Sequence, residues 1–150
     1  MDQVDIKILN ILQNNASVPL ATIAKKVELS TTPCFNRIKK LEESGIIKKR
    51  VAILDNKKLN LPIVVFLSIN VAQHSKEWLE KFVDKLNSFK EVVEIYRLSG
   101  DTDYLIKIMA KSIEEYDKFN QQLIKEINFR SLNSNIVLKE IKNTTVLPLD

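Results

Sequence analysis

Two hydrophobic periodicities divide the chain, and this change of period constrains the fold more than any other feature. Up to residue 44, apolar residues recur every three or four positions, as on one face of an α-helix. From Pro62 onward they alternate, as in "PIVVFLSINVA", where every second side chain faces the same side. We therefore predict two domains, residues 1–54 and 62–150, joined by a polar linker at residues 55–61.

The first domain is predicted to hold three short helices, followed by a strand in "IIKKRVAIL", residues 46–54. The apolar faces of the helices are formed by Val4, Ile8, Ile11 and Leu12, then by Leu20, Ile23, Ala24 and Val27, then by Cys34, Ile38 and Leu41. The tight turn "VELS" between the second and third helices is typical of a helix-turn-helix. Glu28 stands in this turn where glycine is usual, and it costs on the order of 1 kcal/mol if the backbone is left-handed there.

The third helix carries the residues that point to a function. Pro33 favours Thr32 over Ser30 as its N-cap, because a proline pushes the preceding residue away from helical angles. At about 100° per residue, the side opposite the apolar stripe presents Thr32, Asn36, Lys39, Lys40 and Glu43. Hydroxyl, amide and ammonium groups hydrogen-bond base edges and phosphates, and a helix N-terminus suits a phosphate.

We therefore predict DNA contacts from the start and the polar side of this helix. The candidate residues are Ser30, Thr31, Thr32, Pro33, Asn36, Arg37, Lys39 and Lys40. Two alternatives stay open: basic residues on a helix are often only a solvated face, and Arg37 beside the apolar stripe is able to brace the fold through a carboxylate.

The second domain reads as βαββαβ, the ferredoxin-like arrangement, so the predicted class is α+β with a winged-helix-like helix-turn-helix domain in front. Strands are predicted at residues 62–72, 91–99, 103–110 and 134–142, and helices at 75–89 and 112–127, with Ser75 and Ser112 as N-caps. "TTVLPL", residues 144–149, either extends the last strand or pairs separately. Both helices cover one face of the sheet, so Val64 and Phe66 on the other face predict a partner sheet and at least a homodimer.

Charge and cysteine content restrict the class of protein. Residues 1–60 hold eleven Lys or Arg and six Asp or Glu, whereas residues 61–150 carry a net charge of −1. This imbalance is expected when one module meets a polyanion and the other does not. The single cysteine, Cys34, excludes an intrachain disulfide and a cysteine-cluster zinc site. An acidic start and the absence of a long apolar run predict a cytoplasmic protein with no membrane partner.

Longer motifs resemble one family. The opening "VDIKILNILQNN", the segment "LSTTPCFNRIKKL", the exit "GII" and the later "LSGDTDYLIKI" resemble the Lrp/AsnC (leucine-responsive regulatory protein/asparagine-synthesis regulator) family of transcription regulators. The resemblance covers essentially the whole chain in register. It implies DNA binding by the first domain, and sheet-to-sheet dimers of the second that assemble into tetramers or octamers.

The resemblance also implies an amino-acid effector at the turn "SGDTDY". The candidate residues are Gly100, Asp101, Asp103, Tyr104 and Ser134, with a carboxylate for the effector's ammonium group. Leu132 stands where many members carry a threonine, so this position offers no hydroxyl to an effector. Without the resemblance, glycine and aspartate are also the usual residues of a hairpin turn, so the alternative that this turn only joins two strands stays open.

Two other functions remain. One is an architectural DNA-binding protein with no effector. The other is an enzyme that resembles sirohaem decarboxylases, which share this fold and place histidines around a tetrapyrrole; here His74 is the sole histidine. No Ser/His/Asp set, paired-carboxylate cleft or glycine-rich phosphate loop can be assembled. We therefore predict a transcription regulator that is not an enzyme and needs no cofactor or metal.

Overall fold

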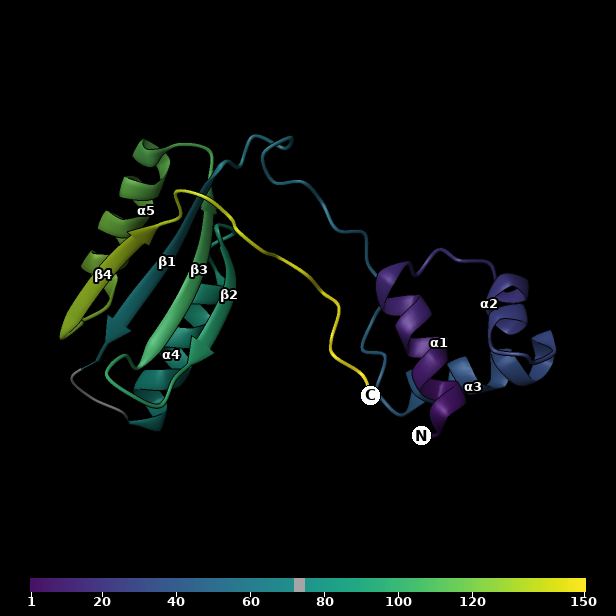
Figure 1. The fold of residues 1–150 in the computed structure, drawn as a ribbon. Helices are drawn as coiled ribbons and strands as arrows, with labels where there is room; N and C mark the ends of the chain where they lie inside the picture. Colours follow the sequence, from purple (N-terminus) through teal and green to yellow (C-terminus); the bar gives the residue numbers. More distant parts are fainter. Residues whose placement is uncertain (72–74) are drawn as a thin grey trace. The chain divides into compact units, whose positions relative to one another are not determined.

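The structure is a computed structural model that describes residues 1–71 and 75–150 (Figure 1). They form two compact units: Met1–Ile53 with Ile141–Asp150, and Leu54–Glu140. The predicted α+β class, with a helix-turn-helix domain before a sheet domain, is confirmed. The second unit ends at residue 140, whereas the predicted second domain runs to residue 150.

The first unit is built from α1 (Gln3–Asn14), α2 (Leu20–Lys26) and α3 (Thr31–Glu43). A capping box starts α1: the Asp5 N–H donates to the Asp2 carboxylate, and the Asp2 N–H donates to the Asp5 carboxylate, both at 2.9 Å. The predicted apolar faces meet in one buried core, which consists of Ile8, Leu12, Ile23, Ala24, Val27, Cys34, Ile38 and Leu41.

The turn between α2 and α3 is left-handed at Glu28, the position where glycine is usual. Glu28 has φ +58°, and the next N–H, that of Leu29, donates to the Ala24 carbonyl at 2.9 Å. This backbone path ends α2 and directs the chain into α3. Glu28 thus adopts a conformation that is strained for a residue with a Cβ and would be unstrained for glycine.

Two local predictions in this unit are wrong. The N-cap of α3 is Ser30, not Thr32, and Pro33 lies inside the first turn. A proline loses no hydrogen bond there, because the first N–H groups of a helix have no partner within it. Residues 46–54 contain no strand, and Val51, Ile53 and Leu54 are exposed. Their β-branched and apolar side chains are typical of a strand, but no neighbouring strand in the described chain takes up their backbone groups.

The second unit is the predicted βαββαβ fold. Its elements are β1 (Ile63–Asn70), α4 (Lys76–Asn87), β2 (Val92–Arg97), β3 (Tyr104–Ala110), α5 (Ile113–Glu126) and β4 (Ser131–Ile136). The antiparallel sheet has the order β2-β3-β1-β4, with Leu67 opposite both Ile106 and Ser134. Ser75 and Ser112 cap α4 and α5 as predicted, each accepting a hydrogen bond from a backbone N–H three residues on, at 3.2 Å.

Both helices lie on the same side of the sheet (Figure 1). The core between them and the sheet contains Val65, Leu67 and Ile69 of β1, Ile106 and Ile108 of β3, Phe82 and Leu86 of α4, and Phe119 and Leu123 of α5. All of these side chains are almost completely buried. The sheet therefore has one closed face and one face without a helix.

The end of the chain differs from its sequence pattern. The last strand spans Ser131–Ile136, not residues 134–142, and residues 144–149 form no strand. Instead, the Leu147 N–H donates to the Gln13 side chain at 2.8 Å, and the Gln13 amide donates to the Leu147 carbonyl at 3.0 Å. This reciprocal pair attaches the tail to α1 within the first unit. Ala72, the predicted end of the first strand, and His74, the sole histidine, lie outside the described residues.

Candidate DNA-binding surface and ligand turn

The outer side of α3 is polar and open. Thr31, Thr32, Asn36, Lys39 and Lys40 are exposed, while Cys34, Ile38 and Leu41 face the core. Within the described residues, the side chains of Asn36 and Lys40 form no hydrogen bond or ion pair. Their donors and acceptors are therefore available to a ligand that approaches this side of the helix.

The start of α3 has spare donors as well. Ser30 occupies the N-cap position without a side-chain capping bond, so its hydroxyl does not satisfy the first N–H groups of the helix. Such groups, together with the positive end of the helix dipole, suit a phosphate oxygen. The predicted positions Ser30, Thr31, Thr32 and Pro33 are all exposed at this end.

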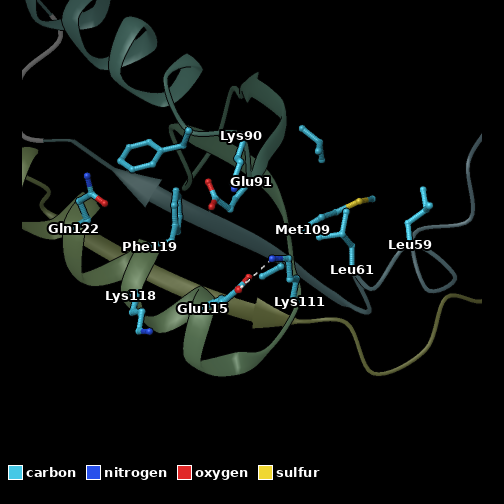
Figure 2. Close-up of a pocket in the computed structure, with 13 residues that line it drawn as sticks. Leu59, Leu61, Lys90, Glu91, Met109, Lys111, Glu115, Lys118, Phe119 and Gln122 are labelled. Carbon is cyan, nitrogen blue, oxygen red and sulfur yellow. Dashed lines mark ion pairs between the residues drawn. The ribbon is translucent and has the colours of Figure 1, made fainter.

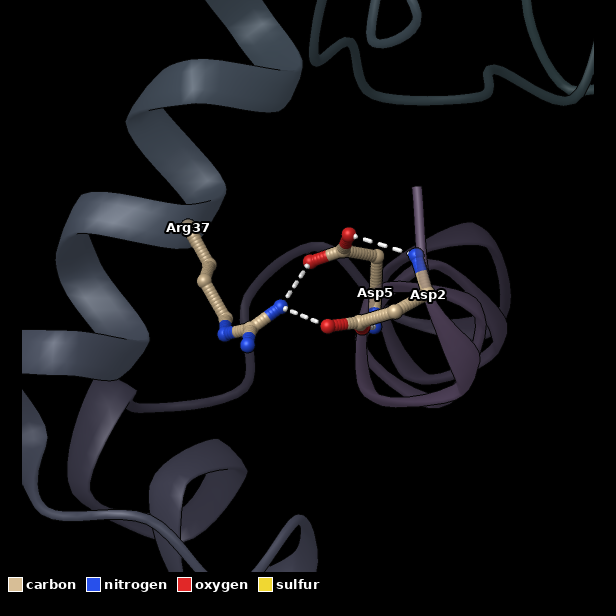
Figure 3. Close-up of polar contacts among 3 residues, drawn as sticks. All are labelled: Asp2, Asp5 and Arg37. Atoms are coloured by element: carbon tan, nitrogen blue, oxygen red, sulfur yellow. Dashed lines mark hydrogen bonds and ion pairs between the residues drawn. The ribbon is translucent and has the colours of Figure 1, made fainter.

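Arg37, unlike Asn36 and Lys40, forms ion pairs with two carboxylates inside the unit. Figure 3 shows its guanidinium between two carboxylates of α1: Nη1 lies 2.7 Å from Asp2 Oδ2 and 2.8 Å from Asp5 Oδ1. The Asp5 N–H and the Arg37 guanidinium both lower the pKa of Asp2, and the carboxylates of Asp5 and Asp2 raise that of Arg37. The alternative reading of Arg37 as a brace between α3 and the start of α1 therefore fits the structure.

The positive charge is partly neutralised within the unit. Lys39 lies 3.6 Å from Glu43 one turn further along α3, and Arg50 lies 2.7 Å from Glu42. The first pair is well exposed and contributes little to stability. Of the three cations predicted on this helix, Arg37 and Lys39 are in ion pairs within the described residues and Lys40 is not. A phosphate can therefore bind Lys40 without first separating an ion pair.

One exposed residue of α3 was missing from the predicted set. The Phe35 ring is 52% exposed, although phenylalanine is usually buried. Phe35 directly follows the buried Cys34 and lies about 100° from it around the axis, at the border between the apolar stripe and the polar side. Its position outside the core was not readable from periodicity alone.

The turn between β2 and β3 is tied to the end of β1. The Asp103 N–H donates to the Ile69 carbonyl at 3.1 Å and lies 2.9 Å from Asn70 Oδ1. The Asp103 carboxylate accepts a hydrogen bond from the Val71 N–H at 2.9 Å. Gly100 has φ +145°, a backbone conformation that side chains with a Cβ rarely adopt, and Gly100 and Asp101 are exposed.

The structure separates the predicted effector residues into two groups. Gly100, Asp101 and Asp103 share the turn, but the Tyr104 side chain is 3% exposed and packs on Phe82 in the core. Ser134 lies opposite Leu67 on β4, and its hydroxyl accepts a hydrogen bond from the Tyr116 hydroxyl at 2.5 Å. Burial raises the pKa of Tyr116, and the bond to Ser134 partly opposes this shift. The side chains of Tyr104 and Ser134 thus have partners within the fold.

The helix-free face of the sheet is partly apolar. Val64 and Phe66 lie on it, and the register of β1 and β3 adds Met109 opposite Val64. Across β2 and β3, Lys107 lies 3.0 Å from Glu94. Burial alone would raise the pKa of Glu94, but the hydrogen bond from Tyr96 and the ion pair with Lys107 lower it overall. This face combines an apolar strip with a charged network.

A hollow of about 460 Å³ lies at the other end of β3 from the turn (Figure 2). Leu59, Leu61, Met109 and Phe119 supply much of its apolar lining, and Lys111 and Glu115 form an ion pair of 3.6 Å in its wall. Its lining contains none of the predicted effector residues. Periodicity missed it because the lining comes from the linker, two strands and α5.

Comparison with known proteins agrees with both units. Residues 1–48 match a winged helix-turn-helix DNA-binding domain, and residues 64–147 match the Lrp/AsnC ligand binding domain. The glutamate uptake regulatory protein of Zymomonas mobilis is 42% identical over 149 residues, which cover 99% of this chain and 91% of that protein. The chain therefore belongs to the Lrp/AsnC family and is a helix-turn-helix transcription regulator with a ligand-binding domain, as the sequence motifs predicted.

Solved structures give the same result. An AsnC family transcriptional regulator from Agrobacterium tumefaciens superposes with a TM-score of 0.93 at 49% identity, covering 99% of this chain and 97% of that one. A transcriptional regulator from Neisseria meningitidis, solved in complex with L-methionine, has a TM-score of 0.93 at 33% identity, covering 99% and 96%. In the part of this chain that the structure describes, no cluster of three metal-ligating side chains occurs, and no helix has the length and apolar character needed to cross a bilayer.

Proposed function

We propose that α3 enters the major groove of DNA and that Asn36 and Lys40 make the contacts that decide affinity. The single observation that carries this proposal is that both side chains are exposed on α3 and have no partner within the described residues. Asn36 has an amide suited to the N6 and N7 edge of adenine, and Lys40 a charge suited to a phosphate. Thr31, Thr32 and the free N–H groups at the start of α3 add phosphate contacts.

The test of this function uses duplexes selected from a random library by the wild-type protein. Asn36→Ala should weaken binding by about 1–3 kcal/mol and relax specificity at one base, whereas Lys40→Ala should weaken all sequences alike. Thermal unfolding verifies that both variants fold. If the double variant binds as the wild type does, α3 is not the recognition helix. Lys76→Ala, an exposed lysine of the second unit, is the matched charge control.

We also propose that a small zwitterionic effector, an amino acid, regulates DNA binding from the turn at residues 98–103. The ligand-binding domain match and the L-methionine complex of the Neisseria meningitidis relative support this class of ligand. Asp101 is exposed and would take the ammonium group, whereas Asp103 would hold the turn against β1. The role predicted for Ser134 requires that its hydroxyl exchange the bond to Tyr116 for one to the ligand.

The helix-free face of the sheet supports a proposal on assembly. We propose a homodimer that buries Val64 and Phe66 against the same face of a second copy, with dimers combining into a tetramer or octamer. A two-fold dimer presents two copies of α3 to a pseudo-palindromic site. The protein would act on DNA in the cytoplasm without catalysing a reaction or needing a cofactor.

The second candidate function is an architectural DNA-binding protein without an effector. It is favoured by one observation: Asp103 and Ser134 are both engaged inside the fold. Calorimetry against the twenty amino acids separates the two functions. Binding at millimolar or lower concentration that is lost in Asp101→Ala supports effector control. The absence of any binding, in a protein that still binds DNA, supports the architectural role.

A further inference from the structure

Phe35 is an apolar side chain in a polar setting. Its ring is 52% exposed, and the exposed positions next to it on α3 are polar: Thr31 one turn before, Lys39 one turn after, and Glu42. A half-exposed aromatic ring keeps a large apolar surface in water, which is unfavourable by about 25 cal/mol per Å². In the described residues the ring has no aromatic partner and no cation over its face. About half of the Phe35 surface therefore contributes no buried contact to the stability of this unit.

The place of Phe35 on the helix determines which ligand it meets. It follows the N-cap Ser30 by five positions, which is about 7.5 Å along the axis at 1.5 Å per residue. The N-terminal residues of a recognition helix are the ones that reach base edges. Around the axis Phe35 lies about 40° from Lys39 and about 60° from Thr32, on the border of the predicted DNA-contacting side.

The chemistry of the major groove then selects one partner. Base edges there are polar except for the 5-methyl group of thymine, which accepts apolar contact from side chains such as phenylalanine. We infer that Phe35 recognises a thymine by packing its ring against that methyl group, and that it is a specificity-determining residue of this regulator. This inference rests on the proposed function of α3. It adds an apolar contact to the polar contacts of Asn36 and Lys40.

The experiment replaces thymines by deoxyuracil, which removes only the 5-methyl group. Duplexes selected by the wild-type protein are remade with one thymine at a time exchanged, and affinities are measured by fluorescence anisotropy at fixed salt. One thymine per half-site should prove sensitive, with about fourfold weaker binding on its replacement, the effect of one buried methyl group. For Phe35→Ala, the thymine and uracil duplexes should bind equally, because the ring that distinguishes them is gone.

Two variants serve as controls. Phe35→Leu keeps an apolar side chain and should retain part of the preference for thymine. Ile124→Ala removes an equally exposed apolar side chain, 52% exposed, from α5 in the other unit, and should leave the preference unchanged. Circular dichroism verifies that Phe35→Ala keeps its helices.

Three outcomes would overturn the inference. The first is a wild-type protein that never distinguishes thymine from uracil, and the second is a preference that survives in Phe35→Ala. The third is a Phe35→Ala variant that changes only the oligomeric state, which would assign the ring to a contact between copies. Failure of the proposed function looks different: Asn36→Ala and Lys40→Ala would then also bind DNA as the wild type does.

Discussion

The Asp103 carboxylate accepts a hydrogen bond from the Val71 N–H at 2.9 Å and thereby joins the β2–β3 turn to the end of β1. Val71 is 5% exposed, so its N–H cannot exchange this partner for bulk water at no cost. A residue predicted to bind an effector is thus also part of the framework of its own turn. A substitution of Asp103 would therefore change both effector binding and the stability of the turn, and each needs its own measurement.

Asp103→Ala should destabilise the second unit by about 1–3 kcal/mol, because it leaves the Val71 N–H without its carboxylate. The sole tryptophan, Trp78, lies on α4, so its fluorescence during urea unfolding reports on this unit alone. Asp101→Ala is the matched control and should stay within about 0.5 kcal/mol of the wild type, since Asp101 is exposed. Equal stability of the two variants would show that the bond to Val71 contributes nothing.

Arg37→Met should lower the melting temperature of the first unit, because it leaves Asp2 and Asp5 side by side without their shared cation. Circular dichroism of the helices measures this change. Lys39→Met removes a cation from an exposed pair on the same helix and should have little effect. If both variants melt alike, the guanidinium does not brace α1 against α3.

The contact between Arg37 and Asp2 also predicts how the stability of the first unit depends on pH. The pKa of Asp2 is lower in the folded protein than its ordinary value of 3.8, because the Asp5 N–H and Arg37 favour the carboxylate. The resulting stabilisation is fully present above that ordinary value and is lost as the pH falls through the lower, folded pKa. Unfolding followed by circular dichroism from pH 6 to 2 should show a smaller loss of stability below about pH 4 in Arg37→Met than in the wild type. Parallel profiles would contradict this linkage.

Glu28→Gly should stabilise the first unit by about 1 kcal/mol, because glycine adopts φ +58° without a Cβ clash. The single cysteine gives a direct assay: Cys34 is fully buried on α3, so a thiol reagent labels it only when this unit opens. Labelling of Glu28→Gly should be about fivefold slower than that of the wild type. Glu28→Ala keeps a Cβ and should not slow labelling; a gain there would point to lost charge repulsion instead of relieved backbone strain.

Phe66→Glu should dissociate the proposed dimer, because a charge buried between two sheets without a partner is costly. Sedimentation velocity at micromolar concentration measures the change from an oligomer to a monomer. Ile124→Glu places the same charge on the outer side of α5 and should leave assembly intact. A wild-type protein that sediments as a monomer under these conditions would refute the assembly.

The sequence alone determined the elements and the family. Helix period in residues 3–43 and strand period from Ile63 are local consequences of which side chains avoid water, so α1, α2, α3 and the βαββαβ order were all predictable. The caps at Ser75 and Ser112 were also predictable, because caps depend on residues within a few positions of one another.

Only the tertiary structure decided which polar groups are available. Arg37 meets Asp2 and Asp5 across 35 and 32 positions of sequence, Asp103 meets Val71 across 32, and Tyr116 meets Ser134 across 18. No local pattern encodes such pairs, because each depends on how two distant elements pack. The same reason explains the strand that was wrongly predicted at residues 46–54: β-branched and apolar residues favour a strand locally, but a strand also needs a neighbour for its backbone groups. Exposure of Phe35, one residue from a buried cysteine, was likewise settled by packing and not by periodicity.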